Sequence, residues 1–174
     1  MKSVAAIVES PFRRIASDFA ASRLALTGLA LFVLILIVAL GAPLISPQNP
    51  YNLAELDILD SKLAPGGKSI DGLTFWLGSD DQGRDLLSAI FYGLRISLGV
   101  GAVSTLAALA IGLTIGLAAA WFGGRIDAVI MRLVDIQLSF PAILIALILL
   151  AALGQGVDKI VIALITVQWA YYAR

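Results

Sequence analysis

The sequence predicts an all-α, polytopic helical membrane protein, because its composition and its long uncharged segments are typical of that class. Of its 174 residues, 60% are hydrophobic and 14% are charged, and the mean hydropathy is +0.96. A soluble domain usually has about 45–50% apolar and about 25% charged residues. We therefore expect four transmembrane helices, an N-terminal interfacial helix and a long external loop.

The residue types that are absent narrow the function further. The chain has no cysteine and no histidine, which excludes disulfides, a thiol nucleophile and a histidine-based metal site. The net charge is zero, so nothing favours a nucleic-acid partner. No Walker A sequence or HExxH motif occurs, and we expect neither an enzyme nor a bound cofactor.

Residues 1–23 form a basic amphipathic leader, which we expect on the cytoplasmic membrane surface. Ser10 and Pro11 suit the N-cap and the first position of a helix. Three apolar residues then recur at helical spacing, namely Phe12, Ile15 and Phe19. A signal peptide is the alternative, but the apolar run that follows is longer than the about 7–15 residues of a signal-peptide core.

Residues 24–45 carry no charge and form the first expected span, since about 20 residues cross the hydrocarbon core. The basic residues Lys2, Arg13, Arg14 and Arg23 precede this span. The positive-inside rule therefore places the N-terminus in the cytoplasm. Prolines at positions 43, 47 and 50 are expected to end the helix.

Residues 46–96 then form an external loop with an interfacial helix. The loop has four basic and seven acidic residues, in weak agreement with an outside location. Ser79 and Gln82 have the spacing of a capping box, which predicts a helix that starts at Asp80 or Asp81. That helix should lie on the membrane surface and lead into a span near Ser97.

Within this helix, Gly83 would occupy the third position, where glycine suggests close backbone approach or a bend. Arg84 and Asp85 are adjacent, so they cannot face each other on a helix. Each therefore needs another partner, in the outer loop or in another subunit.

The permease core is expected at residues 97–174, with spans at about 97–122, 136–153 and 160–173. Small residues occupy every fourth position of the first of these spans: Ser104, Ala108, Gly112, Gly116 and Ala120. Such a stripe favours close packing of another helix. Pro141 is expected to kink the next span near its start.

Four charged residues, Arg125, Asp127, Arg132 and Asp135, separate two of these spans. Charges are costly at the bilayer centre, so we expect them at the cytoplasmic interface. Arg132 and Asp135 have a spacing that permits an ion pair on a helix. The span cores lack ionisable residues, which argues against a proton pump or a voltage sensor.

Several segments resemble one family. LGSDDQGRD at 77–85, followed by Ser88, Gly93 and the RISL of 95–98, resembles the signature before the second span of ABC-importer permeases of the dipeptide, oligopeptide and nickel type. ISPQNPYN at 45–52 and GGRIDAVIMRLVDIQLSFP at 123–141 are similar to the same family. WAYYAR at 169–174 looks like the entry to its cytoplasmic coupling loop, so we expect an N-terminal fragment of a longer permease.

The resemblance implies a transmembrane subunit of an ATP-driven importer in a bacterial inner membrane. The implied partners are a second permease, two ATP-binding subunits and a periplasmic solute-binding protein. The signature residues would then lie at the periplasmic mouth: Gly78, Asp80, Gly83, Arg84, Asp85 and Arg95. The alternative is a small structural or assembly protein that binds a partner helix through the Ser104–Ala120 stripe.

Overall fold

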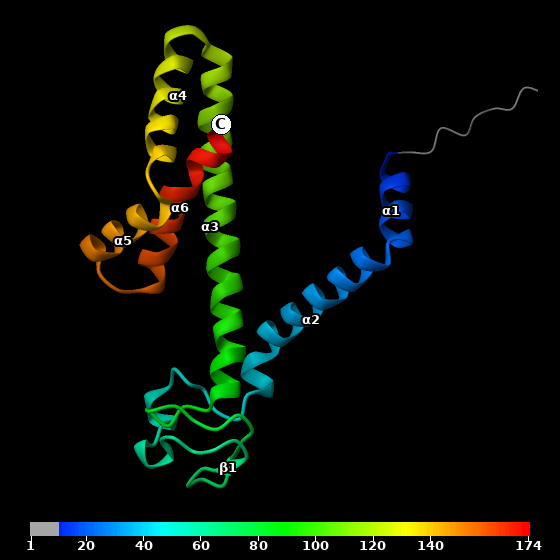
Figure 1. Cartoon of the computed structure of the whole chain (residues 1–174), viewed down its shortest axis with the longest axis vertical. Coiled ribbons are helices and arrows are strands. Elements are labelled where there is room, and N and C mark those ends of the chain that lie inside the picture. The colour runs from blue at the N-terminus through cyan, green and yellow to red at the C-terminus, as the bar shows by residue number, and fades with distance from the viewer. Residues whose placement is uncertain (1–10) are drawn as a thin grey trace, which may run out of the picture. The chain divides into compact units, whose positions relative to one another are not determined.

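The computed structural model describes residues 11–174, so Lys2, Ser10 and the start of the predicted leader lie outside the described residues. The chain forms two compact units that divide after Arg95. Each unit is described by itself below, and helix α3 contributes to both (Figure 1).

The first unit begins with helices α1 (Pro11–Ala21) and α2 (Arg23–Ile45). Pro11 is the first described helical residue, and the expected Ser10 cap stays a prediction because that residue lies outside the described range. Ser22 separates the two helices and caps α2, because its side-chain oxygen accepts a hydrogen bond from Ala25 N–H. Helix α2 continues past Pro43 to Ile45, so its end lies two residues beyond the first proline that was expected to terminate it.

The segment after α2 is folded rather than an open loop. It contains two short 3₁₀ helices, η1 (Leu53–Glu55) and η2 (Ile58–Asp60), and an antiparallel pair of strands, β1 (Gly67–Lys68) and β2 (Thr74–Phe75). Phe75 is fully buried and forms the apolar centre of the segment. We call residues 46–85 the loop module.

The expected start of a helix at Asp80 or Asp81 is wrong. Helix α3 runs without a break from Leu86 to Phe122, through the position where the span was expected to begin. Residues 80–83 form a turn closed by a hydrogen bond from Gly83 N–H to the Asp80 carbonyl. Ser79 therefore caps no helix, and Asp85 takes that role for α3.

The second unit contains the rest of α3 together with α4 (Gly124–Ser139), α5 (Ala142–Leu153) and α6 (Val157–Ala173). The chain reverses at Gly123, where α3 ends and α4 begins (Figure 1). The four charged residues expected in a connection lie on α4 instead. The predicted kink at Pro141 is a full break, since α4 and α5 meet there at 88°.

Two helices in the described part of the chain are long and apolar enough to cross a membrane, namely α2 and α3. A third crossing is available if α4 and α5 together make one broken span. Helix α6 has 17 residues. Four crossings are therefore not confirmed and stay a prediction.

Candidate functional site

The first candidate site is the junction between the loop module and α3. Asp85 and Ser88 are both fully buried there. One carboxylate oxygen of Asp85, Oδ2, accepts hydrogen bonds from Ser88 N–H at 2.8 Å and from the Ser88 hydroxyl at 2.5 Å. This arrangement satisfies one of the backbone donors that a helix leaves free at its N-terminus.

Gln48 ties the start of the loop module to this junction. Its side-chain oxygen accepts a hydrogen bond from Asp85 N–H at 2.8 Å. Its side-chain amide donates to the carbonyl of Glu55 at 2.9 Å. Gln48 lies in the ISPQNPYN segment, yet no property of the sequence alone predicted its contact with a residue 37 positions away.

Ser79 lies at the centre of a second set of contacts within the module. Its hydroxyl accepts a hydrogen bond from Leu63 N–H at 2.8 Å and donates to the Asp60 carbonyl. The Asp60 carboxylate in turn accepts from Ile70 N–H at 2.9 Å. Asp60 and Ser79 are both buried, so these bonds replace contacts with water and hold the module closed.

Two glycines of the predicted signature allow the backbone to fold this tightly. Gly78 and Gly83 have φ angles of +80° and +75°, a region that favours glycine. A Cβ atom on Gly83 would collide with the Asp57 carbonyl, and one on Gly78 would collide with the Leu63 carbonyl. The predicted close approach at Gly83 is confirmed, although Gly83 lies in a turn and not in a helix.

We expect Gly83→Ala to open the loop module, because it adds the collision with Asp57 to the strain of a positive φ. Gly72→Ala is a matched control, since Gly72 has φ +79° but nothing lies within 4 Å of the position that an added Cβ would take. Overpacking costs about 1–3 kcal/mol, so amide exchange in residues 46–85 should accelerate far more for Gly83→Ala. Equal acceleration in both variants would mean that backbone strain alone matters.

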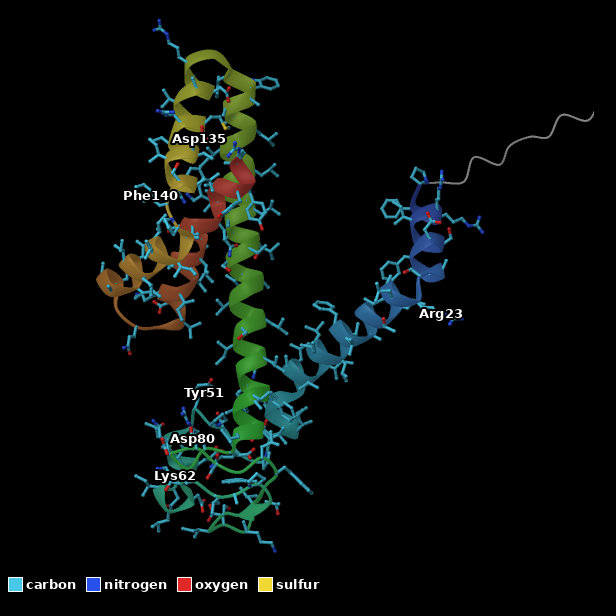
Figure 2. The ribbon with its side chains drawn as sticks, in the orientation of Figure 1. Arg23, Tyr51, Lys62, Asp80, Asp135 and Phe140 are labelled. Carbon is cyan, nitrogen blue, oxygen red and sulfur yellow. The ribbon has the colours of Figure 1, made fainter. Side chains whose placement is uncertain are left out.

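Arg84 pairs with Asp80 inside the turn. The guanidinium lies 2.6 Å from Asp80 Oδ2, and both side chains are partly exposed. Burial raises the pKa of the Asp80 carboxyl, but the hydrogen bonds from Arg84 and Gln82 and the Arg84 charge outweigh it, so this pKa is lowered. Hydrogen bonds from Asn49 and Asn52 likewise lower the pKa of Glu55. Figure 2 shows Asp80, Lys62 and Tyr51 in the loop module.

These two carboxylates predict acid sensitivity of the loop module. A lowered folded-state pKa contributes stability above the unfolded value, about 4, and that stability is lost as the pH falls through the folded value. A fluorophore on Ser61→Cys should therefore report opening only below about pH 4. In an Asp80→Asn, Glu55→Gln background that step should shrink, and an unchanged step would assign it to other groups.

The second candidate site is the contact between α3 and α6. A Cβ atom on Gly112 would lie 2.7 Å from Tyr172 Cβ and would also collide with the Trp169 carbonyl. A Cβ atom on Gly116 would collide with the Ala173 carbonyl. The two backbones therefore approach each other where only glycine fits on α3, as in the small-residue contacts of membrane helices.

The predicted stripe needs a correction at its last member. Ser104, Ala108 and Gly112 are buried, but Ala120 is exposed and Ala119 is buried in its place. Four residues rotate a helix by about 400°, which is about 40° past a full turn. Five positions at this spacing therefore drift around the helix, and a step of three from Gly116 to Ala119 restores the buried face.

Helix α4 also packs against α6, through a small core of Val134, Ala170 and Ala173. Gln137 adds a polar contact, since its side-chain amide donates to the Thr166 carbonyl at 2.5 Å. Gln137 was not among the predicted site residues. A single amide in an otherwise apolar segment is the signal that could have identified it, because such side chains often bond across membrane helices.

The charged residues of α4 do not form the predicted pair. Asp135 lies 3.6 Å from Arg174 instead of contacting Arg132. Both partners are more than half exposed, so the pair contributes little stability. Arg125 and Arg132 are exposed on α4, as Arg95 is on α3. Asp135 and Phe140 are labelled in Figure 2.

Two family descriptions match separate parts of the chain, one before Asp85 and one over the contact between α3 and α6. Residues 10–65 match the "N-terminal TM domain of oligopeptide transport permease C", and residues 112–174 match the "Binding-protein-dependent transport system inner membrane component". The chain belongs to the permease family of dipeptide, oligopeptide and nickel ABC importers. Members of this family are multi-pass membrane proteins, in agreement with the apolar helices α2 and α3.

Three relatives of the chain are named as transport system permease proteins. The chain is 34% identical to a dipeptide transport system permease protein of Alkalihalophilus pseudofirmus, over 95% of the chain and 51% of the relative. It is 36% identical to a di/tripeptide transport system permease protein of Pseudomonas aeruginosa, over 97% of the chain and 54% of the relative. It is also 34% identical to a nickel transport system permease protein of Escherichia coli, over 72% of the chain and 43% of the relative. The chain thus spans about half the length of these relatives.

Proposed function

We propose that this chain forms part of the translocation pathway of an ATP-driven importer for peptides or related small solutes. The observation that carries the proposal is the match of residues 112–174 to the inner-membrane component, over the segment where α3, α4 and α6 pack together. A pathway through a membrane needs such a helix bundle, and ATP-driven transport requires the bundle to have two arrangements.

The proposed topology has four crossings: α2, α3, the broken pair α4–α5, and α6. The N-terminus lies in the cytoplasm, because the basic residues Arg13, Arg14 and Arg23 precede α2. The loop module then lies in the periplasm, and the charged residues of α4 lie at the cytoplasmic interface. In this arrangement the signature residues around Asp85 hold the outer end of α3 at the periplasmic mouth.

The proposed partners follow from the family. A second permease subunit completes the pathway, two ATP-binding subunits hydrolyse ATP on the cytoplasmic side, and a periplasmic solute-binding protein delivers the solute. Arg125, Asp127, Arg132 and Asp135 face the cytoplasmic subunits in this arrangement. The lipid bilayer surrounds the helices. No ATP hydrolysis is assigned to this chain.

The alternative of a structural or assembly protein depends on a free small-residue stripe. Gly112 and Gly116 are already in contact with α6 of the same chain, which weighs against that alternative. Affinity capture of the tagged chain, expressed from its own chromosomal locus, tests the two functions. We expect ATP-binding subunits and a second permease in the eluate. Capture of a single unrelated membrane protein, without ATP-binding subunits, would support the alternative.

The topology can be tested with single cysteines, because the chain has none of its own. We place them at Ser10, Ser61, Gly124 and Gln155 and apply an impermeant thiol reagent to cells with an accessible periplasm. Labelling is expected only at positions 61 and 155, since the other two lie on the cytoplasmic side. Labelling at position 124 without labelling at 61 would invert the proposed orientation.

A further inference from the structure

Helix α1 presents an apolar face that no other described residue covers. None of its 11 residues is buried. Phe12, Ile15 and Phe19 are 88%, 67% and 42% exposed. Large apolar side chains exposed together on one short helix indicate a surface that binds something. The chemistry of that partner follows from the residues beside this face.

The apolar and basic residues of α1 occupy separate sides. With 3.6 residues per turn, Phe12, Ile15 and Phe19 fall within an arc of about 60°. Arg13 and Arg14 lie about 130° to either side of the centre of that arc. A helix that lies in a membrane surface has this arrangement, with its apolar face toward the acyl chains and its basic residues among the headgroups.

The positions of the arginines are unfavourable for the helix itself. Arg13 and Arg14 lie in the first turn of α1, which contains no acidic residue. The N-terminus of a helix carries partial positive charge and favours anions. Both arginines therefore oppose the helix dipole, and an external anion would relieve this repulsion.

The direct connection between α1 and α2 indicates where the anion that pairs with these arginines lies. Only Ser22 separates α1 from α2, which is apolar on all sides and long enough to cross a membrane. Arg23 begins α2, so a third basic residue lies where α1 meets α2. At about 1.5 Å per residue, 11 residues are too short to span the bilayer. The surface next to α2 is therefore the one available to α1.

We propose that α1 is a binding site for anionic phospholipid headgroups. Phe12, Ile15 and Phe19 insert into the upper acyl region, and Arg13, Arg14 and Arg23 bind lipid phosphates on the surface from which α2 enters the membrane. Each basic residue near an anionic membrane surface increases binding about fivefold. The site would fix the start of α2 at one depth and orientation in the bilayer.

Spin labels on the full chain test this site. Ile15→Cys places a label on the apolar face and Ser17→Cys places one on the opposite face. We compare nanodiscs of pure phosphatidylcholine with nanodiscs that also contain phosphatidylglycerol. The label at 15 should become accessible to oxygen and protected from a water-soluble nickel complex when phosphatidylglycerol is present. The label at 17 should stay accessible to the nickel complex.

Substitutions then separate charge from apolar insertion. Arg13→Gln with Arg14→Gln should lower the ratio of inserted to free α1 in phosphatidylglycerol by roughly 25-fold. Arg13→Lys with Arg14→Lys should largely preserve it. Lys62→Gln with Lys68→Gln removes the same charge from the loop module and should leave the ratio unchanged.

Three results would overturn the proposal: equal insertion in both kinds of nanodisc, protection of both labels from both reagents, and no effect of removing the two arginines. The first would indicate apolar insertion without anion recognition, and the second would indicate that protein covers α1. None of these measurements requires transport or partner subunits, so their failure is distinguishable from failure of the proposed function.

Discussion

Gly112→Leu and Gly116→Leu should each separate α6 from α3 and lower the thermal stability of the chain strongly. Even one added methyl group collides with the backbone of α6 at Trp169 or Ala173, and backbone cannot give way as a flexible side chain can. Overpacking costs about 1–3 kcal/mol in ordinary cores, so Gly112→Ala and Gly116→Ala should fall in that range and the leucine variants above it. Thermal unfolding in detergent measures the order.

The same helix supplies the controls for this prediction. Gly101→Ala also adds a methyl group to α3, but nothing lies within 4 Å of the added atom. Leu113→Ile changes shape without adding volume at an exposed position. Both should be close to neutral. If the Gly112 and Gly116 variants unfold at the same temperature as these controls, the face of α3 that carries the two glycines does not contact α6 in the folded chain.

Asp85→Ala should open the junction between the loop module and α3. The change removes the cap on Ser88 N–H, worth about 0.5–2 kcal/mol, and leaves the buried Ser88 hydroxyl without its partner, which costs about 1–3 kcal/mol more. Amide exchange in residues 46–85 should therefore accelerate by roughly 100-fold. In the assembled transporter, uptake should fall while insertion of the chain into the membrane is unchanged.

Matched variants isolate the cap. Asp85→Asn keeps an oxygen that accepts from Ser88 but places an amide NH2 where the other Asp85 oxygen has no hydrogen-bond partner among the described residues, so this variant should open the junction less than Asp85→Ala but more than the parent. Arg84→Ala should impair uptake less than Asp85→Ala, because the Asp80 pair is partly exposed. Lys62→Ala and Lys68→Ala should do little, since the Lys62–Asp81 pair is fully on the surface. Undiminished uptake in Arg84→Ala and Asp85→Ala alike would leave the signature without a transport role.

The sequence predicted the elements whose signal is local and long. The uncharged run at 24–45 became α2 with a start one residue earlier, and the span expected at about 97–122 lies in α3, which ends at Phe122. The composition of each segment is enough to predict these helices, because a helix forms its backbone hydrogen bonds within itself and needs no distant partner. The side of α3 that carries Gly112 and Gly116 was predictable for the same reason.

The loop module was not predictable from local patterns. Ser79 and Gln82 match a capping box, yet Ser79 bonds to Leu63 and Asp60, which lie 16 and 19 positions away. At Ser79 these tertiary contacts outweigh the local preference for a helix cap. The positive φ of Gly83 is also incompatible with a right-handed helix through residues 80–83. Phe75, which no local pattern marks as a core residue, is buried inside the module.

The sequence predicted the position of the break at Pro141, but it predicted a kink and not an angle of this size. A proline removes one backbone donor and typically kinks a helix, whereas α4 and α5 meet at 88° because both pack against α6. The contact between Gln137 and Thr166 lies beside this break. The angle therefore depends on a third helix, which no property of residues 136–153 describes.

If this chain forms part of a transport pathway, solute uptake must depend on it. The chain, assembled with its ATP-binding and permease partners in proteoliposomes, is supplied with the solute-binding protein outside and ATP inside. A labelled dipeptide, a longer peptide and a nickel chelate serve as test solutes. We expect at least one of them to accumulate only when ATP and this chain are both present. Accumulation at the same rate in proteoliposomes that lack this chain would contradict its place in the pathway.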